Sequence, residues 1–371
     1  MTKNTMHAAR LHAAGDDMKI ETVDRPSLRT DEVLVRVEAC SVVQNLANVL
    51  ESMKDEDSAM AYPTLPAIFG LDVAGTIETC GELVTGLAVG DRVYINPGLG
   101  CGGCKACRTG REIDCDAFAL RGYFSMSDKG QQTLDQYPVG GFAEMMPAPQ
   151  RSVVRIPDKL DFPTAARLGY LGTAYRALKL GNCGPGKIVY VDGISGTLGL
   201  GAVALALALG ADKVLGAARN TDLFAKVKAL GEPGQVEILE SGTRDVKEWA
   251  RDVTGGRGVD IAVDALGGGS PVEPLQQALY SLNRGGSFVN IGAMTDEVPI
   301  SLMWAMSNNI RILSSSWFTT AEAQEMADMV QQGRLDLTFF ETEAFPLTKV
   351  NEAIAAPDPK RGGFANYVVT P

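Results

Sequence analysis

The stretch that best indicates the fold of this chain begins with the apolar run Ile188-Val-Tyr-Val191. It continues through Gly193-Ile-Ser-Gly196-Thr-Leu-Gly199-Leu-Gly201 into a segment rich in alanine and leucine. Strand, glycine turn and helix follow in the order that a dinucleotide pyrophosphate loop requires. Glycines allow the tight turn and the close approach of phosphate oxygens, while the helix N-terminus supplies partial positive charge. Glycines also serve ordinary turns, so the flanking strand and helix are what favour a cofactor loop. Its expected contacts are Gly193, Ser195, Gly196, Thr197, Leu198 and Gly199.

The chain as a whole shows two patterns of secondary-structure signals. Up to about residue 155, short β-branched runs such as Glu32-Val-Leu-Val-Arg-Val-Glu-Ala39 are broken by glycine and proline, which predicts a mostly β region. From about Phe162, helix and strand alternate, which predicts βαβ units and a parallel sheet. The expected elements are a helix from Thr164, a strand over 187–192, a helix from Leu198, a strand over 213–217, a helix from Asp222 and buried strands over 259–264 and 287–291.

The end of the second strand of such a fold selects between nicotinamide cofactors, because an acidic side chain there binds the ribose 2′-hydroxyl and repels a 2′-phosphate. Here the stretch reads Val214-Leu-Gly-Ala-Ala218-Arg219-Asn220, and Ala218 occupies the position where that acidic residue would stand. Arg219 can pair with a phosphate or stack on adenine, and Asn220 adds hydrogen-bond donors. Charge complementarity therefore favours NADP over NAD. The alternative is that Arg219 is only a solvated residue that opens the next helix.

Four cysteines lie in one short run: Cys101, Cys104, Cys107 and Cys115. Thiolates at this spacing can surround one tetrahedral zinc ion and leave no position for a substrate, which indicates a structural site. A disulfide framework is the poorer interpretation. Only seven cysteines are spread over 371 residues, and the opening Met-Thr-Lys-Asn-Thr-Met lacks the apolar core of a secretory signal.

Composition narrows the function classes. A chain of 371 residues with 45% hydrophobic residues predicts two domains. The net charge of −11, with 34 Lys and Arg against 45 Asp and Glu, argues against nucleic acid as a partner. The longest apolar run, residues 198–211, is too short for a membrane-spanning helix. We therefore expect a cytoplasmic protein that acts on a small molecule.

Together with the cysteine run and the glycine loop, five further motifs make the chain resemble the zinc-containing medium-chain alcohol dehydrogenases over essentially its whole length. These motifs are Gly70-Leu-Asp-Val-Ala-Gly75, Gly90-Asp-Arg-Val93, Gly140-Gly-Phe-Ala-Glu144, Val263-Asp264-Ala-Leu-Gly267-Gly and Asn290-Ile-Gly-Ala293. The resemblance implies an α/β protein with a GroES-like, mostly-β catalytic domain at residues 1–159 and 319–371, carrying a zinc lobe at about 97–116. It also implies a Rossmann domain with a doubly wound parallel sheet at 160–318, and a homodimer or homotetramer. The family's further cofactor contacts fall on Ala265, Ile291 and Gly292.

The chain departs from the family at the catalytic zinc. There the ligands are an early cysteine, the histidine of a Gly-His-Glu, and a later cysteine or aspartate. Aligned on the family's Ala-Cys-Gly-Val-Cys-His-Ser-Asp, this chain has Val43 at the ligand cysteine and Asn45 at the proton-relaying hydroxyl. Gly-His-Glu becomes Gly70-Leu71-Asp72, and Tyr170 falls where the last ligand is expected.

A shifted alignment would bring Cys40 to the ligand position but would not supply a histidine. The chain has only two, His7 and His12, which we expect to be surface or strand residues. Without Lewis-acid polarisation, hydrogen bonds must replace several kcal/mol of oxyanion stabilisation. We infer that the catalytic zinc is absent.

The chemistry that remains is hydride transfer from NADPH to a polarised acceptor, and a conjugated C=C bond suits a neutral donor better than a simple ketone does. Tyr170 is the expected hydrogen-bond donor or proton source, with Asn45 as a second oxyanion contact and Asp72 as an acid or orienting group. In the structural alternatives, Tyr170 fills the space of the metal, Asn45 bonds its own backbone, and Asp72 is a capping or salt-bridged carboxylate.

Other candidates are weaker. Tyr123, Phe124 and the methionines Met53 and Met60 could line a substrate cleft, although such residues are usually ordinary packing; Trp317-Phe318 is more typical of an interface or core. Two other functions stay open. One is a conventional zinc-dependent alcohol dehydrogenase with unrecognised ligands, and the other is a low-turnover NADPH-binding protein with a regulatory or structural role.

Overall fold

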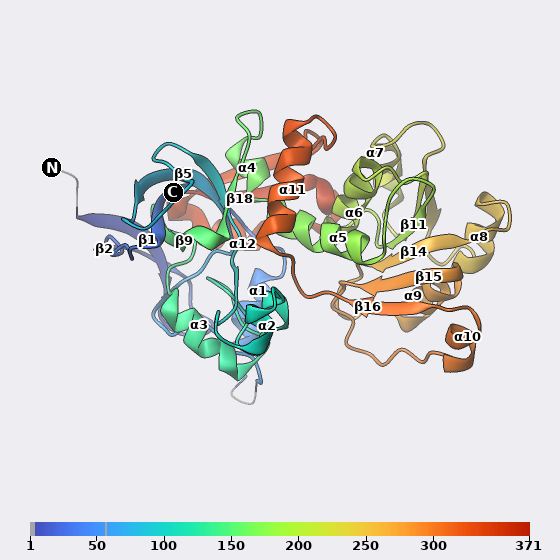
Figure 1. Cartoon of the computed structure of the whole chain (residues 1–371), viewed down its shortest axis with the longest axis horizontal. Coiled ribbons are helices and arrows are strands. Elements are labelled where there is room, and N and C mark those ends of the chain that lie inside the picture. The colour runs from blue at the N-terminus through green and yellow to red at the C-terminus, as the bar shows by residue number, and fades with distance from the viewer. Residues whose placement is uncertain (1–3, 56–57) are drawn as a thin grey trace.

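The computed structural model of the chain describes residues 4–55 and 58–371, so the first three residues of the opening segment lie outside it. Two large sheets follow one another along the long axis of the molecule (Figure 1). One is a seven-stranded mixed sheet with the carboxyl end of the chain in it, and the other is a six-stranded parallel sheet. No helix in the described residues is long and apolar enough to cross a membrane.

The parallel sheet has the strand order β13-β12-β11-β14-β15-β16, and every neighbouring pair is parallel. The chain starts at β11 and winds outward in both directions, which leaves a crevice at the carboxyl ends of β11 and β14. The strands are β11 (Ile188–Asp192), β12 (Lys213–Ala218), β13 (Val236–Glu240), β14 (Val259–Asp264), β15 (Leu282–Asn290) and β16 (Arg311–Ser314).

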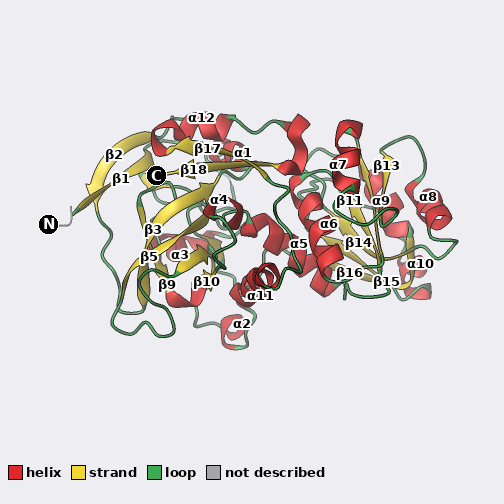
Figure 2. Cartoon of the chain, turned by 90° about the horizontal axis from the view of Figure 1, so that it is seen from above, coloured by secondary structure: helices red, strands yellow, loops and turns green. Residues whose placement is uncertain are grey.

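Helices cover both faces of this sheet because its central strand is apolar on both. Val189 and Val191 of β11 pack into one hydrophobic cluster, and Ile188 and Tyr190 pack into another. Figure 2 shows α5 and α6 on one side of the sheet and α8 and α9 on the other. The helices of this region are α5 (Leu168–Leu180), α6 (Thr197–Ala208), α7 (Phe224–Lys228), α8 (Val246–Val253), α9 (Val272–Tyr280) and α10 (Leu302–Ser307).

The mixed sheet is assembled from both ends of the chain. Its order is β10-β6-β5-β3-β18-β17, with β9 also paired to β3. These strands are β3 (Glu32–Ser41), β5 (Asp72–Cys80), β6 (Arg92–Ile95), β9 (Met145–Pro149), β10 (Val153–Arg155), β17 (Glu341–Pro346) and β18 (Ala365–Thr370). The expected division into a split, mostly β region and a continuous α/β region is thus present, while the bounds 159/160 and 318/319 stay a prediction.

Smaller elements complete this half. A three-stranded sheet has the order β2-β1-β4, and β7 pairs with β8 beside the cysteine run. These and the remaining helices are β1 (Thr5–Leu11), β2 (Lys19–Asp24), α1 (Leu46–Ser52), β4 (Ala67–Ile68), β7 (Gly98–Leu99), α2 (Lys105–Arg108), β8 (Ala119–Leu120), α3 (Gln131–Gln136), α4 (Phe162–Ala165), α11 (Thr320–Gln331) and α12 (Val350–Ala355).

Three expected boundaries were wrong. The helix expected from Thr164 is two helices, α4 and α5, separated by a turn at residues 166–167, because α4 packs on the mixed sheet and α5 packs on α6. The helix expected from Asp222 begins at Phe224, after a 3₁₀ turn. The strand expected over 287–291 starts earlier, at Leu282, because its register with β14 shifts between Val259 and Ile261 and admits the extra residues.

Candidate active site, cofactor loop and metal lobe

The four cysteines of the lobe converge on one point. Their sulfur atoms all lie within 4.8 Å of one another. The Sγ atoms of Cys104 and Cys107 are 3.5 Å apart, far beyond the 2.05 Å or so of a disulfide. Cys104 also caps the short helix α2 through its sulfur, which accepts from the Cys107 N–H. Four sulfur ligands in this arrangement fit a tetrahedral zinc ion with no open position.

The glycine loop has the geometry of an anion cradle. Gly193 has a φ of +73°, and the Gly196 N–H donates to its carbonyl oxygen at 2.8 Å. A Cβ on Gly199 would lie 2.1 Å from that same oxygen, so only glycine lets the helix approach the turn. Helix α6 then begins at Thr197 without a side-chain cap, and the buried Thr197 hydroxyl has no partner. Free N–H groups and an orphan hydroxyl at a helix N-terminus fit a pyrophosphate.

The other expected loop contacts lie around the same edge. The Ser195 carbonyl accepts from the Gly363 N–H at 2.8 Å, so the carboxyl-terminal part of the chain packs on the loop. The Ala265 N–H donates to the carbonyl of Asp192, and the Ile291 N–H donates to that of Asp264. Gly292 lies close against Asp264, since a Cβ there would be 2.9 Å from its carboxylate. These residues together frame the crevice at the ends of β11, β14 and β15.

Two buried aspartates at this edge were missed by the sequence analysis. Asp192 and Asp264 are register partners in β11 and β14, and each has one carboxylate oxygen without a partner. Burial and the neighbouring Asp264 charge raise the pKa of Asp192 to about 7, and burial raises the pKa of Asp264. The sequence does hold a signal for this pair, since both strands end in aspartate. Neighbouring parallel strands place their carboxyl ends at the same edge of the sheet, so the two side chains should meet there.

At the end of β12, the two residues expected to bind the 2′-phosphate differ in their surroundings. Arg219 is exposed, directly after the buried Ala218. Asn220 instead donates from its side-chain amide to the Lys360 carbonyl at 2.9 Å and accepts from the Asp222 N–H. One of the Asn220 donors is therefore already engaged by the chain, whereas the Arg219 side chain faces solvent.

Asp72 lies at the start of β5 in the protein interior, with 1% of its surface exposed. The Tyr94 hydroxyl donates to Asp72 Oδ1 at 2.7 Å, and Oδ2 has no partner. Burial raises the pKa of Asp72 to about 7, against the opposing effects of the Tyr94 hydrogen bond and the Arg167 charge. Asp72 is therefore neither a helix cap nor a surface salt bridge, and it can exchange a proton near neutral pH.

Tyr170 and Asn45 meet at the same place. The backbone N–H of Gln44 donates to the Tyr170 hydroxyl oxygen at 2.8 Å, which leaves the phenolic proton free to be donated. The Asn45 side chain accepts from Asn48 at 2.9 Å and does not cap its own helix. It also lies beside the hydroxyl of Tyr123, whose pKa is raised by burial. The structure thus brings together Tyr170, Asn45 and Asp72 and adds Tyr123 to them.

The cleft residues do not form a metal-ligand set. Val43 and Leu71 are buried side chains without ligand atoms, and Cys40 is buried beside Asp72. A Cβ on Gly169, next to Tyr170, would lie 2.1 Å from Asp72 Oδ1, so Asp72 fills the space over this glycine. In residues 4–55 and 58–371, only the lobe cysteines form a group of three or more converging His, Cys, Asp or Glu side chains.

The two histidines lie outside the cleft. His7 and His12 each contact a surface glutamate, Glu144 and Glu21 respectively. Trp317 and Phe318 stack on each other in the interior, and the Trp317 indole donates to Asn96 at 2.9 Å. The expectation of structural roles for both pairs agrees with these contacts.

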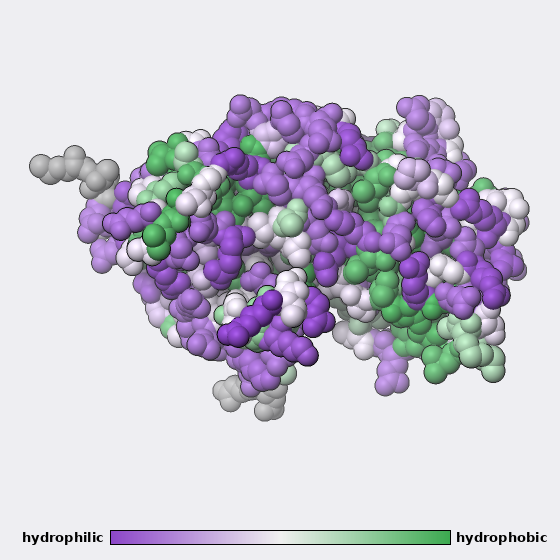
Figure 3. All heavy atoms as spheres, viewed as in Figure 1, coloured by the Kyte–Doolittle hydropathy of each residue, from purple (hydrophilic) through white to green (hydrophobic). Residues whose placement is uncertain are grey.

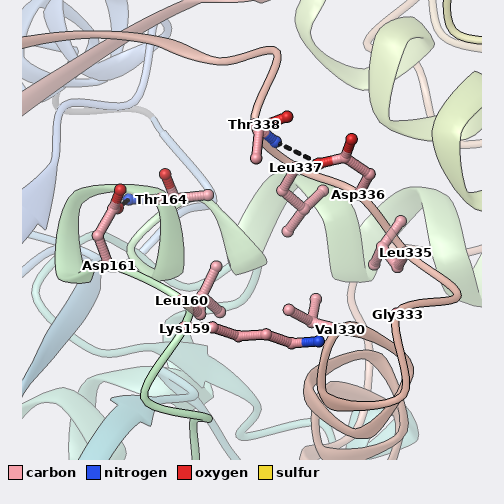
Figure 4. Close-up of a pocket in the computed structure, with 10 residues that line it drawn as sticks. All are labelled: Lys159, Leu160, Asp161, Thr164, Val330, Gly333, Leu335, Asp336, Leu337 and Thr338. Atoms are coloured by element: carbon pink, nitrogen blue, oxygen red, sulfur yellow. Dashed lines mark hydrogen bonds between the residues drawn. The ribbon is translucent and has the colours of Figure 1, made fainter.

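A cavity of about 320 Å³ lies beside the end of α11 (Figure 4), and none of these groups lines it. Its charged side chains are used within the chain: Lys159 donates to the Gln331 carbonyl, Asp161 caps α4, and Asp336 accepts from the Thr338 N–H. We therefore assign it no role in the chemistry.

Comparison with known proteins places the chain in a family. Residues 29–158 match the alcohol dehydrogenase GroES-like domain, and residues 197–332 match the zinc-binding dehydrogenase domain. An alcohol dehydrogenase of Geobacillus stearothermophilus is 31% identical over 351 residues, covering 94% of each chain. The sorbitol dehydrogenase of Bacillus subtilis (strain 168) is 29% identical over 352 residues, covering 94% of this chain and 92% of that one.

The same likeness holds in three dimensions. The crystal structure of AibC superimposes with a TM-score of 0.83 at 26% identity, covering all of this chain and 97% of that one. A GroES-like domain joined to a Rossmann sheet, with a four-cysteine lobe, defines a medium-chain oxidoreductase. The chain belongs to the zinc-containing medium-chain alcohol dehydrogenase family.

Proposed function

We propose that this oxidoreductase uses NADPH to reduce an activated C=C bond, of the enone or enal type, or a carbonyl group, without a catalytic zinc ion. The observation that carries the proposal is the composition of the cleft. Where relatives of this family hold a metal, this chain presents the hydroxyls of Tyr170 and Tyr123 and the amide of Asn45 around the buried carboxyl of Asp72. Neutral donors of this kind stabilise an oxyanion as it forms.

Tyr170, Asn45 and the Gln44 backbone have distinct roles in this scheme. When bound, NADPH supplies the hydride that attacks the substrate carbon. As the electron pair of the C=O bond moves onto oxygen, the Tyr170 O–H donates to that oxygen and transfers its proton, and water then reprotonates the phenolate. For a conjugated C=C bond, the hydride would add at the β carbon while the same hydroxyl holds the enolate oxygen, and a proton from water would then complete the reduction at the α carbon. The Gln44 N–H, 2.8 Å from the Tyr170 oxygen, stabilises the phenolate in the interval. Asn45 supplies a second contact to the substrate oxygen.

Tyr170→Phe tests this assignment, because it removes one hydroxyl and leaves the ring. We expect kcat to fall on the order of a hundredfold, the usual effect of losing an oxyanion donor or general acid, with little change in NADPH affinity. Tyr175→Phe on the same helix is the matched control, since the Tyr175 hydroxyl contacts Glu325 at 2.7 Å. Turnover would be followed as NADPH oxidation with enals, enones and aldehydes. Equal kcat values for wild type and Tyr170→Phe would show that the Tyr170 hydroxyl has no role in turnover and that the ring only packs.

The same measurements separate the competing functions. A second zinc ion per chain, required for turnover, would favour a conventional zinc-dependent alcohol dehydrogenase with ligands outside those described above. NADPH binding without oxidation by any carbonyl or enone in the panel would favour a low-turnover regulatory or structural protein.

The choice of NADPH rests on Arg219, an exposed cation at the end of β12 where no acidic side chain stands. A charge-assisted contact to a phosphate contributes roughly 1.5–3 kcal/mol, or about ten- to a hundredfold in affinity. Arg219→Ala should therefore weaken NADPH binding by that factor and leave NADH binding nearly unchanged in fluorescence titrations. Arg251→Ala, an exposed arginine on α8, is the control. Equal wild-type affinities for NADH and NADPH would count against the assignment.

We also propose a homodimer or homotetramer formed through β16. This strand is the edge of the parallel sheet, paired only with β15 in the described residues. Next to it, Leu302, Met303 and Met306 of α10 are 77%, 68% and 67% exposed, and Figure 3 shows hydrophobic residues gathered on this part of the surface. A second copy that extends the sheet would cover both features. Analytical ultracentrifugation at micromolar concentration would measure the assembly.

A further inference from the structure

One buried cation next to the cleft has no role in the scheme above. Arg167 precedes α5, and only 1% of its surface is exposed. Its Nη2 donates to the Gly363 carbonyl at 3.4 Å, while Nε and Nη1 have no partner. A buried guanidinium is normally paired with an anion, because the unpaired charge is costly away from water. In the described part of the chain, no carboxylate lies within 4 Å of Arg167 to form an ion pair.

The groups that face Arg167 define its setting. Its guanidinium carbon lies 4.9 Å from the centre of the Tyr170 ring and 5.4 Å from that of Phe340, which are cation–π distances. The charged and titratable groups that it influences are Tyr170, Asp72 on β5 and Tyr367 on β18. Arg167 therefore places a fixed positive charge against the ring that carries the proposed proton donor.

This charge is only partly cancelled at neutral pH. Asp72 is the carboxyl group whose charge acts on Arg167, and its second carboxylate oxygen has no donor. Because its pKa is raised to about 7, Asp72 is largely protonated below that pH. Arg167 lowers the pKa of both Asp72 and Tyr170, in opposition to burial. Tyr94 reaches the network through its hydrogen bond to Asp72, and the Cys40 thiol lies beside the same carboxyl.

The position of the guanidinium is also fixed from the cofactor side. The Gly363 carbonyl accepts from Arg167, and the Gly363 N–H donates to the Ser195 carbonyl in the glycine loop at 2.8 Å. A Cβ on Gly363 would lie 2.4 Å from the Gly196 carbonyl, so this segment is in direct contact with the loop. The cation is thus held between the phenol and the cofactor loop.

We propose that Arg167 is a positioning residue that supplies the positive charge of the cleft, acting through the Tyr170 ring to favour the oxyanion and to strengthen the phenol as a proton donor. The inference rests on the proposed function. In this arrangement ionised Asp72 opposes Arg167, so the carboxyl works best in its protonated form. A site without Lewis-acid polarisation would then draw its electrostatic stabilisation from a buried side chain.

Arg167→Met and Arg167→Lys test the inference through the pH dependence of kcat. Wild-type turnover should fall as pH rises through about 7, as Asp72 ionises, and Asp72→Asn should abolish this limb. Loss of the Arg167 charge removes what favours the carboxylate, so Arg167→Met should move the limb upward by about one pH unit or more. It should also lower kcat about tenfold or more, as expected when the donor is weaker by a pKa unit. Arg167→Lys, which keeps the positive charge, should retain most of the wild-type kcat and most of the wild-type position of the pH limb.

A double-variant cycle separates action through Tyr170 from general stabilisation. With Tyr170→Phe already present, Arg167→Met should cause little further loss of kcat. Arg121→Met is the control, because Arg121 is also buried with an unpartnered nitrogen but donates to the Pro147 carbonyl away from the phenol. It should lower the melting temperature and leave the pH limb in place. If Arg167→Met does not fold, Arg167→Gln provides the same comparison.

Two results would overturn the inference while leaving the proposed function intact: an unchanged pH limb in an active Arg167→Met or Arg167→Gln protein, or additive losses with Tyr170→Phe. A wild-type protein that reduces no enal, enone or aldehyde, or that needs a second zinc ion, would defeat the proposed function itself.

Discussion

Gly169→Ala is a minimal change that reports on the contact between α5 and the Asp72 carboxyl. The added methyl group would lie 2.1 and 2.2 Å from the two Asp72 oxygens and 2.4 Å from Cγ. Ordinary contact needs about 3.4 Å or more, so the carboxyl must move by more than about an ångström. It has no free direction, because Asp72 is buried and bonded to Tyr94. Overpacking of this kind costs about 1–3 kcal/mol, partly offset by the gain of about 0.5–1 kcal/mol from replacing a helical glycine.

We therefore expect a net loss of about 1–2 kcal/mol in Gly169→Ala. Displacement of Asp72 should also lower kcat on the order of a hundredfold, since such misplacement in a site is typically that costly. Differential scanning calorimetry and steady-state reduction assays measure the two effects. Gly184→Ala is the control, because nothing lies within 4 Å of its added methyl group.

A cycle with Asp72→Ala isolates the cause. Asp72→Ala removes the three atoms that the methyl group meets, so Gly169→Ala should no longer destabilise the protein in that background. If the two changes instead add, or if Gly169→Ala is as silent as Gly184→Ala, the Asp72 carboxyl is not held against Gly169 in the folded protein.

Two further predictions concern the metal lobe and the aspartate pair. The purified protein should contain close to one zinc ion per chain by elemental analysis, and Cys104→Ser should lose it and melt at a lower temperature while still binding NADPH; zinc retained by this variant would contradict the four-sulfur site. Asp192 has a folded-state pKa of about 7, above its usual 3.8, so its contribution to stability is present below about pH 4 and is lost as pH rises through 7. Asp192→Asn should therefore raise the melting temperature of the cofactor-free protein at pH 8 and flatten its decline with pH, and a variant that melts lower than wild type at pH 8 would contradict this.

The sequence was informative where a feature is local. The glycine loop and the cysteine run each lie within a stretch of 15 residues or fewer, so their spacing alone determines which atoms converge. The strands β11, β12 and β14 were predicted to within a residue, because buried parallel strands are continuous apolar runs.

What sequence could not predict depends on tertiary contact. Arg167 reads as one more charged residue in an alanine-rich helix, yet the chain breaks the helix there and buries the side chain. The position of Gly169 under Asp72 joins β5 to α5, and no pattern in either element signals it. Tyr123 had been grouped with residues that are usually packing, and only the fold brings its hydroxyl beside Asn45.

The place of β18 in the mixed sheet has a consequence for synthesis on the ribosome. This strand lies between β3 and β17, pairing residues from opposite ends of the chain. The parallel sheet comes from one continuous stretch and can form while the nascent chain is still being extended. The mixed sheet cannot close until residues 365–370 have left the exit tunnel, so the carboxyl-terminal end of the almost wholly buried β3, beyond its pairing with β9, must wait unpaired on that edge. Chaperone demand and sensitivity to carboxyl-terminal trimming should both concentrate on that interval.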